Sequence, residues 1–213
     1  MLRHLPIKLE GGLAVAAMLE RGSRGYVAVP YGLEGLSSGS SASVCVPIAA
    51  SILAESFPEL ELSFESRPEA CLEAVAEGRS SVAVIPEEEF RLAYPEADCE
   101  PLEGIMPAAS QGIIAVLCGA DSCRARVWAS SFNHMPTRIE AGAERGIMKL
   151  MGAGPSAPVG ISGEMEDMFV RIRAVSSIRG ELRSADEYVQ ADYVMDDLLG
   201  IAEYLDGKRD EVI

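Results

Sequence analysis

Positive charge is scarce in this sequence. The chain of 213 residues has 18 Lys and Arg residues against 33 Asp and Glu residues, only three of the basic residues are lysine, and the net charge is −15. Nucleic-acid binding depends on neutralising phosphates with Lys and Arg. We therefore expect no nucleic-acid partner, and any anionic ligand would need a locally positive pocket.

Long hydrophobic runs are also missing. No apolar stretch approaches the ~18–20 residues that a membrane-spanning helix requires. The N-terminal segment MLRHLPIKLEGG has neither the apolar core nor the cleavage site of a signal peptide. We therefore expect a soluble, cytoplasmic protein with no membrane partner, and its 48% hydrophobic residues suffice for a core.

The cysteines and histidines lack the spacing of a metal site. The five cysteines form no C-x-x-C pair, and the two histidines do not lie at ligand spacing from any cysteine pair. The sequence therefore predicts no zinc site. An odd number of cysteines in a cytoplasmic chain indicates buried, reduced thiols. They are Cys45, Cys71, Cys99, Cys118 and Cys123.

Strands and helices alternate in the first half of the chain. Apolar runs at residues 12–19 and 26–29 predict two strands joined by a turn at residues 20–25, and the Ser/Gly-rich residues 36–41 predict a linker. A βαβαβ pattern follows, which predicts a parallel sheet with ligands beyond the C-terminal ends of its strands. Its strands are expected at residues 43–46, 60–64 and 82–85, and its helices at residues 48–57, 66–78 (from a capping box of Ser66 and Glu69) and 86–94.

The second half of the chain predicts an α+β arrangement. A strand is expected at residues 113–118. A helix capped by Asp121 is expected to continue to Phe132, and a second helix is expected at residues 133–151. Residues 168–175 alternate as a half-exposed strand does, and residues 177–182 are expected to pair with them across a turn. Ser184 and Glu187 predict a capping box at the start of a helix. The apolar residues that follow are spaced three or four positions apart, which predicts that this helix continues to Leu205.

One stretch carries a specific resemblance. Residues 132–160 read FNHMPTRIEAGAERGIMKLMGAGPSAPVG. This stretch resembles the segment of the porphobilinogen deaminase (hydroxymethylbilane synthase) family that enters its C-terminal domain. Glu20–Gly25 is similar to the family's E-R-x-D-x-R-D-A, and Gln111 and Gly112 match the end of its L-P-A-P-G-Q-G. The matched positions in the stretch are Asn133, His134, Thr137, Ala143, Glu144, Arg145, Gly154, Pro158 and Gly160.

The resemblance implies a fold of class α/β. A βαβαβ, periplasmic-binding-protein-like domain with a parallel sheet is followed by a small α+β C-terminal domain, a three-stranded antiparallel sheet with helices. Residues 1–35 are then a remnant of a first domain, residues 36–100 the second domain, residues 101–118 a return strand to the first, and residues 119–213 the C-terminal domain. Most of the family's first domain has no counterpart here.

The resemblance also implies a transferase of tetrapyrrole biosynthesis, which joins porphobilinogen units into hydroxymethylbilane on a covalent dipyrromethane cofactor. The family needs a Cys for that cofactor, an Asp for the cationic intermediates and arginines for acetate and propionate groups. Pro155 stands at the Cys position and His4 at the Asp position. Four arginine positions hold Ile48, Ala49, Glu65 and Cys71.

These replacements indicate a degenerate active site. Residues 40–100 hold three arginines, no lysine and 13 acidic residues, although they should face a polyanion. We expect no dipyrromethane cofactor and no activity of this chain alone. Two functions stay open: a deaminase-like protein of porphyrin and heme biosynthesis, and a non-catalytic binding, regulatory or partner subunit on the same scaffold. The partner would be a second copy of this chain, or a separate chain that supplies the missing first domain.

The candidate site residues follow the same resemblance. His4 is the candidate catalytic base, and the alternative is a terminal residue with no role. Arg3, Gln111, Gly112 and Arg145 are candidate substrate-binding residues. The alternatives are an ordinary loop amide for Gln111, and for Arg145 a helix salt bridge to Glu144 or to a neighbouring residue. Cys118 and Cys123 are distant candidates to replace the missing cofactor Cys.

Overall fold

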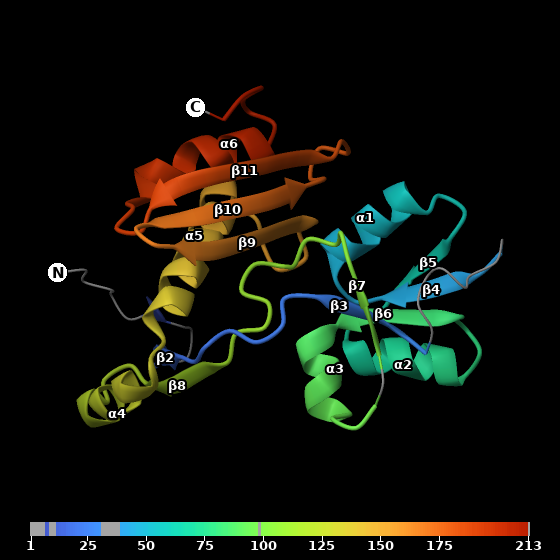
Figure 1. Cartoon of the computed structure of the whole chain (residues 1–213), viewed down its shortest axis with the longest axis horizontal. Helices are drawn as coiled ribbons and strands as arrows, with labels where there is room; N and C mark the ends of the chain where they lie inside the picture. The colour runs from blue at the N-terminus through green and yellow to red at the C-terminus, as the bar shows by residue number, and fades with distance from the viewer. Residues whose placement is uncertain (1–6, 9–11, 31–38, 98, 213) are drawn as a thin grey trace.

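The computed structural model describes residues 7–8, 12–30, 39–97 and 99–212. Its strands form one five-stranded sheet and two three-stranded sheets (Figure 1). The first lies on the right of Figure 1, and the other two lie on the left, on either side of a long helix, α5 (Met135–Met151). Within these residues no helix combines the length and the apolar character needed to cross a bilayer.

The five-stranded sheet contains the predicted βαβαβ unit. β4 pairs in parallel with both β5 and β6, as the alternating pattern indicated. β3 extends this sheet rather than pairing with β2: it is antiparallel to both β6 and β7. The order across the sheet is β5 (Glu61–Phe64), β4 (Ser41–Val44), β6 (Val82–Pro86), β3 (Tyr26–Val29) and β7 (Glu100–Leu102).

Helices cover both faces of that sheet. α1 (Pro47–Ser56) packs Ala49 and Leu53 against one face, in a cluster with Val44. α2 (Pro68–Ala76) and α3 (Glu87–Ala93) pack on the other face. The predicted capping box of α2 is wrong: the N-cap is Arg67, and no side chain caps the helix. Pro68 takes the first helical position, where a missing N–H costs nothing.

The C-terminal sheet is antiparallel and three-stranded, as expected. β10 (Phe169–Ser176) lies between β9 (Val159–Glu166) and β11 (Arg183–Gln190). α5 and α6 (Leu199–Leu205) pack on this sheet, where thirteen buried residues form the largest core cluster. α/β and α+β parts therefore share the chain, as the sequence indicated.

The helix predicted from Ser184 to Leu205 is wrong in its first half. Residues 183–190 form β11, which pairs with β10 over eight residues, and residues 177–182 form the turn rather than the partner strand. α6 begins only after a short 3₁₀ turn, η4 (Met195–Leu198). Pairing with β10 outweighs the local helical spacing, because an edge strand leaves residues such as Tyr188 half exposed and so tolerates either pattern.

The third sheet has the order β1 (Ile7–Lys8), β2 (Leu13–Met18) and β8 (Ala115–Gly119). α4 (Cys123–Ala129) and the 3₁₀ turn η3 (Ser130–Phe132) follow β8. Asp121 does not cap α4, because the N-cap is Ser122 without a side-chain bond.

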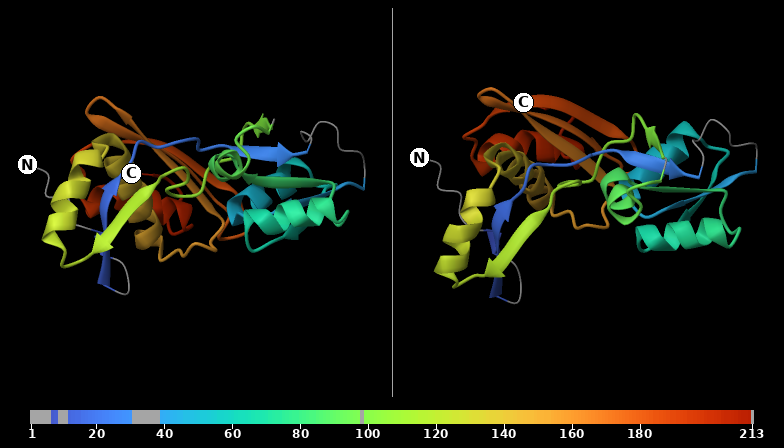
Figure 2. Two further views of the ribbon diagram at one scale, coloured as in Figure 1. Left: turned by 90° about the horizontal axis from the view of Figure 1, so that it is seen from below. Right: turned by 60° about the horizontal axis from the view of Figure 1, so that its bottom comes forward.

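The segments between β2 and β3 and between β7 and β8 run side by side from one half of the molecule to the other (Figure 2). The backbone N–H of Leu19 donates to the carbonyl of Ile114 at 3.0 Å, and that of Gly22 donates to the carbonyl of Gly112 at 2.8 Å. Residues 20–25 therefore form a crossing segment and not a hairpin turn.

Candidate functional site

The Asn-His-Thr motif fixes the start of α5. His134 is the N-cap, and its Nδ1 lies 3.0 Å from Thr137 Oγ1. The Asn133 side chain accepts a hydrogen bond from the N–H of Met18 at 3.1 Å, and the N–H of His134 donates to the carbonyl of Met18 at 2.8 Å. The motif thus joins α5 to β2 and holds the helix in place.

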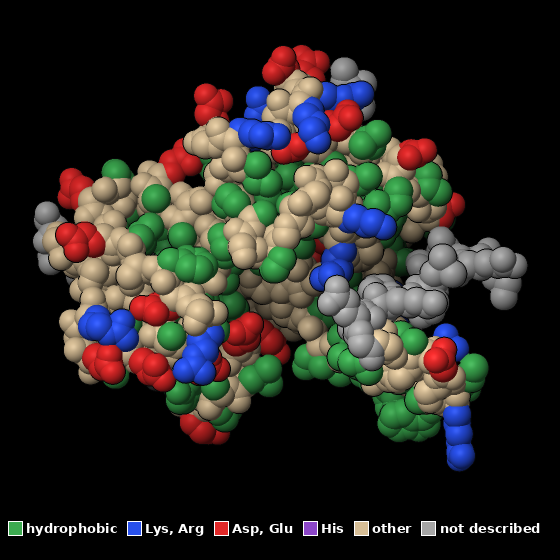
Figure 3. Space-filling model, turned by 180° about the vertical axis from the view of Figure 1, so that it is seen from behind, with side chains coloured by type: hydrophobic (Ala, Val, Ile, Leu, Met, Phe, Trp, Pro, Cys, Tyr) green, Lys and Arg blue, Asp and Glu red, His purple; other side chains and the backbone are tan. Residues whose placement is uncertain are grey.

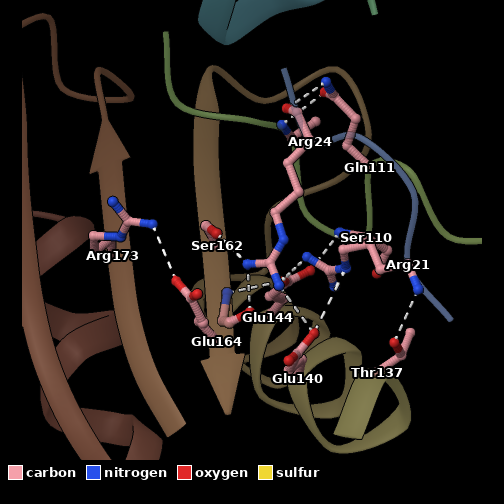
Figure 4. A network of polar contacts seen from close by, with 12 residues as sticks. Arg21, Arg24, Ser110, Gln111, Thr137, Glu140, Glu144, Ser162, Glu164 and Arg173 are labelled. Carbon is pink, nitrogen blue, oxygen red and sulfur yellow. Dashed lines mark hydrogen bonds and ion pairs between the residues drawn. The ribbon is translucent and has the colours of Figure 1, made fainter. Parts of the chain in front are cut away.

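A buried network of ion pairs centres on Glu144 (Figure 4). Arg21 Nη1 donates to the Glu144 carboxylate at 2.7 Å, and the N–H groups of Ser110 and Gly163 donate to it at 2.6 Å and 2.8 Å. Burial raises the pKa of Glu144, and the hydrogen bond from Arg21 counteracts that shift. The crossing segment, α5 and β9 therefore meet at one carboxylate.

Arg24 adds a second set of bonds to the same network. Its guanidinium donates to Ser162 Oγ and to the carbonyl of Gly163, both at 2.6 Å, and to Glu140 at 3.1 Å. Burial and the neighbouring Arg21 lower the pKa of Arg24. Both arginines of the crossing segment are thus engaged within the chain.

Gln111 and Gly112 lie in the second crossing segment. The Gln111 amide nitrogen donates to the carbonyls of Arg24 and Gly25, both at 2.9 Å, and its oxygen accepts from the N–H of Ala108 at 3.1 Å. Gly112 has φ +75°, a conformation that favours glycine. Both residues hold the two crossing segments together, and neither lines the cavity described next.

A cavity of about 760 Å³ lies between the two halves of the molecule. Its walls come from the β4–α1 connection, α5 and the loop between α5 and β9. α5 contributes Arg145 and Lys149 one turn apart, on one face of the helix. Neither cation forms an ion pair with a described residue, and Arg145 does not bind Glu144, whose oxygens face Arg21.

The start of α1 faces the same cavity. Val46 is its N-cap and offers no side-chain hydrogen bond, and Pro47 and Ile48 also line the cavity. The first intrahelical bond is donated by Ala50, at 3.1 Å to the carbonyl of Val46. Backbone N–H groups ahead of that bond carry the positive end of the helix dipole and favour an anion. The cavity thus combines two cations with a helix N-terminus.

The residues present do not fit a covalent dipyrromethane. Pro155 lines the cavity, and none of the lining residues in the described part of the chain is Cys, Ser, His, Asp or Glu. Cys118 lies in β8, and Cys123 lines a separate, smaller cavity of about 550 Å³. Arg3 and His4 lie outside the described residues.

The four positions that the resemblance assigns to arginines are filled without a cation. Ile48 and Ala49 are buried in α1, and Cys71 is buried in α2. Glu65 pairs with Arg79 at 3.2 Å. The described residues contain no group of three or more His, Cys, Asp or Glu that could hold a metal ion.

Lys149 and the α1 N-terminus are features of the candidate site that the sequence analysis missed. Lys149 stands four residues after Arg145, a spacing that places both on one helix face and could have signalled the pair. The position of α1 opposite them depends on how the two halves pack, which no local pattern encodes. In a comparison with models of known protein families, no model matches this chain.

Proposed function

We propose that this chain is a hydroxymethylbilane synthase-like protein of tetrapyrrole biosynthesis that has lost catalysis and keeps an anion-binding cavity. The observation that carries the proposal is the composition of the cavity wall: Arg145, Lys149 and the start of α1 favour an anion there. Pro155, which the sequence resemblance aligns with the family's cofactor Cys, lines the same cavity. A carboxylate is a suitable ligand, because guanidinium and ammonium groups form charge-assisted hydrogen bonds with it.

The number of cations limits the size of the ligand. A growing pyrrole chain adds an acetate and a propionate with each unit, whereas the described residues that line the cavity include two cations, Arg145 and Lys149. Each carboxylate without a partner would lose the solvation that water gives it. We therefore propose a ligand with one or two carboxylates and no tight binding of a linear tetrapyrrole.

A role as a partner subunit is the second candidate, and a separate surface favours it. Large apolar side chains are exposed on the third sheet and the helix after it, among them Val127 at 74%, Trp128 at 66% and Leu117 at 48%. Figure 3 shows hydrophobic side chains gathered on this part of the surface. Apolar groups this exposed, when contiguous, mark interaction sites on soluble proteins. A second copy of this chain, or a separate partner chain, would cover them.

The test of the proposed function combines turnover and binding. Purified chain is incubated with porphobilinogen, and uroporphyrin absorbance is followed after acid oxidation, for wild type and for Pro155→Cys. We expect no turnover by either protein, because the Cys alone restores neither the arginines nor the acid, and intact mass should show the bare chain. Turnover by wild type, or a mass increase of two linked pyrroles, would overturn the non-catalytic proposal.

Binding of porphobilinogen is measured by calorimetry on the same samples. Arg145→Ala and Lys149→Ala should each weaken it about 3- to 10-fold, which corresponds to partly exposed charged contacts. Arg124→Ala, which removes an exposed cation on α4 away from the cavity, is the matched control and should leave affinity unchanged. Equal losses in all three variants would show that net charge, and not this cavity, governs binding.

A further inference from the structure

The smaller cavity, of about 550 Å³, lies between β2, α4 and the start of α5. One face of α4 and of the turn after it lines this cavity, because Cys123, Arg126 and Ser130 follow one another at three and four positions. Arg138, from α5, lines it as well. Two cations from two helices therefore share one cavity, and none of its described lining residues is acidic.

Both arginines lack a counter-ion among the described residues. The Arg126 guanidinium donates to the Cys123 sulfur at 3.4 Å, and that of Arg138 donates to the Asn133 side-chain oxygen at 3.2 Å. Neither forms an ion pair with a described residue, although the chain has 33 Asp and Glu residues. Burial lowers the pKa of Arg138, and no described carboxylate counteracts that shift. An anion in the cavity would replace the hydration that these cations lose.

We propose that this second cavity binds a small phosphate monoester. Near neutral pH such an ester carries about −1.5 to −2 charges and three acceptor oxygens. Two guanidiniums that reach the cavity from different helices match this group better than they match the single charge of a carboxylate. The volume of the cavity lies within the range of small-molecule sites.

The rest of the wall suits the organic part of the ester. Val15 and Ala16 of β2 and Met135 of α5 line the cavity with apolar side chains. An apolar organic group would cover them while the phosphate contacts the arginines. The two cavities have no lining residue in common, so this site does not depend on the function proposed for the large cavity.

The exposed thiol of Cys123 reports whether the cavity is filled. The whole chain is treated with iodoacetamide over a series of phenyl phosphate concentrations, at neutral pH and constant ionic strength, and alkylation of each cysteine is followed by peptide mass spectrometry. We expect phenyl phosphate to slow the alkylation of Cys123 in a saturable way, and to leave that of Cys99, in the five-stranded half, unchanged. Benzoate and inorganic phosphate should need higher concentrations, because benzoate has a single charge and inorganic phosphate has no organic group.

Separate variants test the two arginines. Arg126→Ala and Arg138→Ala should each raise the phenyl phosphate concentration that halves the alkylation rate of Cys123 by about 10-fold or more, as the loss of one charged hydrogen bond does. Each variant is compared with and without phenyl phosphate, so a change in the intrinsic reactivity of Cys123 cancels. The side-chain bond of Arg126 stays within α4, so Arg126→Ala keeps the test valid if Arg138→Ala loses stability.

Three control variants change charge outside the cavity wall. Arg124→Ala on α4, Arg145→Ala in the large cavity and Trp128→Glu on the exposed face of α4 should all keep the protection of Cys123. Loss of protection in any of them would overturn the proposal, because it would assign the effect to general charge, to the large cavity or to self-association. So would an absence of protection in wild type, or equal protection by benzoate or inorganic phosphate.

Discussion

At the scale of single residues, Arg21 is a buried cation whose ion-pair partner is also buried. Its side chain is only 5% exposed, and it binds Glu144, whose side chain is fully buried. Arg21→Ala would leave the Glu144 carboxylate buried without its cation. We expect the free energy of unfolding to fall by about 3–5 kcal/mol, as for other broken buried pairs, in urea denaturation.

Arg173→Ala is the control for this experiment. Arg173 pairs with Glu164 at 3.4 Å, and both side chains are about half exposed (44% and 52%). Exposed pairs contribute about 0–1 kcal/mol, so we expect little change. A similarly small change in Arg21→Ala would show that the buried network contributes little to holding the crossing segment on α5.

Glu87 predicts a pH dependence. The hydrogen bond from Ser23 Oγ, at 2.5 Å, lowers the pKa of Glu87, and Arg91 at 2.6 Å adds to the shift. A carboxyl with a lowered folded pKa stabilises the fold above its unfolded value of about 4.5 and loses that effect as the pH falls through the folded pKa. Wild type should therefore be more stable than Glu87→Gln at pH 6, and this difference should shrink below pH 4.5.

Thermal unfolding of both proteins from pH 6 to pH 3 measures this difference. Glu59→Gln is the control, since Glu59 is exposed and makes no hydrogen bond or ion pair with a described residue. A stability difference between wild type and Glu87→Gln that stays constant with pH would contradict the role assigned to the Glu87 carboxylate.

Local spacing predicted some of these residues and not others. The Asn133, His134 and Thr137 cap is a short-range motif, so the sequence places it correctly at the start of α5. Arg21 and Glu144 are 123 positions apart, and their pairing follows only from the packing of the crossing segment on α5. The sequence analysis therefore paired Glu144 with its neighbour Arg145. In the structure Glu144 pairs with Arg21 instead.

At the scale of elements, Gly112 connects the two crossing segments. It has φ +75°, and a Cβ there would lie 2.2 Å from the Ser23 carbonyl oxygen. Gly78, after α2, has φ +71° and no atom within 4 Å of such a Cβ. We expect Gly78→Ala to cost about 1–2 kcal/mol from backbone conformation alone, and Gly112→Ala to cost clearly more, in urea denaturation.

The comparison isolates the contact between the segments, because the backbone strain is nearly equal in the two variants. Equal losses of stability would mean that the crossing segments separate readily and that their hydrogen bonds contribute little.

The secondary structure of the elements in the five-stranded sheet could be predicted from the sequence, whereas that of the edge strand β11 could not. β4, β5 and β6 and the helices between them follow from alternation along the chain, because both faces of that sheet are covered. Among the described residues, β11 pairs with one strand, β10, and its residues fit a helical or a strand pattern equally well. Its identity depends on β10, and thus on tertiary structure.

At the scale of the whole molecule, we predict that the chain self-associates through the third sheet and α4. Light scattering at micromolar concentration should give about twice the chain mass of 22.7 kDa. Trp128→Glu, on the exposed face of α4, should restore the monomer, because a charge in an apolar interface loses its hydration. Leu92→Glu, at a position on α3 that is 65% exposed, should not. A wild-type monomer would count against self-association and favour a separate partner chain.

The hydrogen bonds between the crossing segments show that the five-stranded half is inserted between β2 and β8. Leu19 pairs with Ile114 and Gly22 with Gly112, so the chain leaves the β2–β8 pair and returns to it at neighbouring points. A tight turn in place of everything between those points would close a continuous hairpin. The five-stranded half thus lies between two neighbouring points of the β2–β8 pair, and the part of the cavity wall formed by Val46, Pro47 and Ile48 belongs to this inserted half.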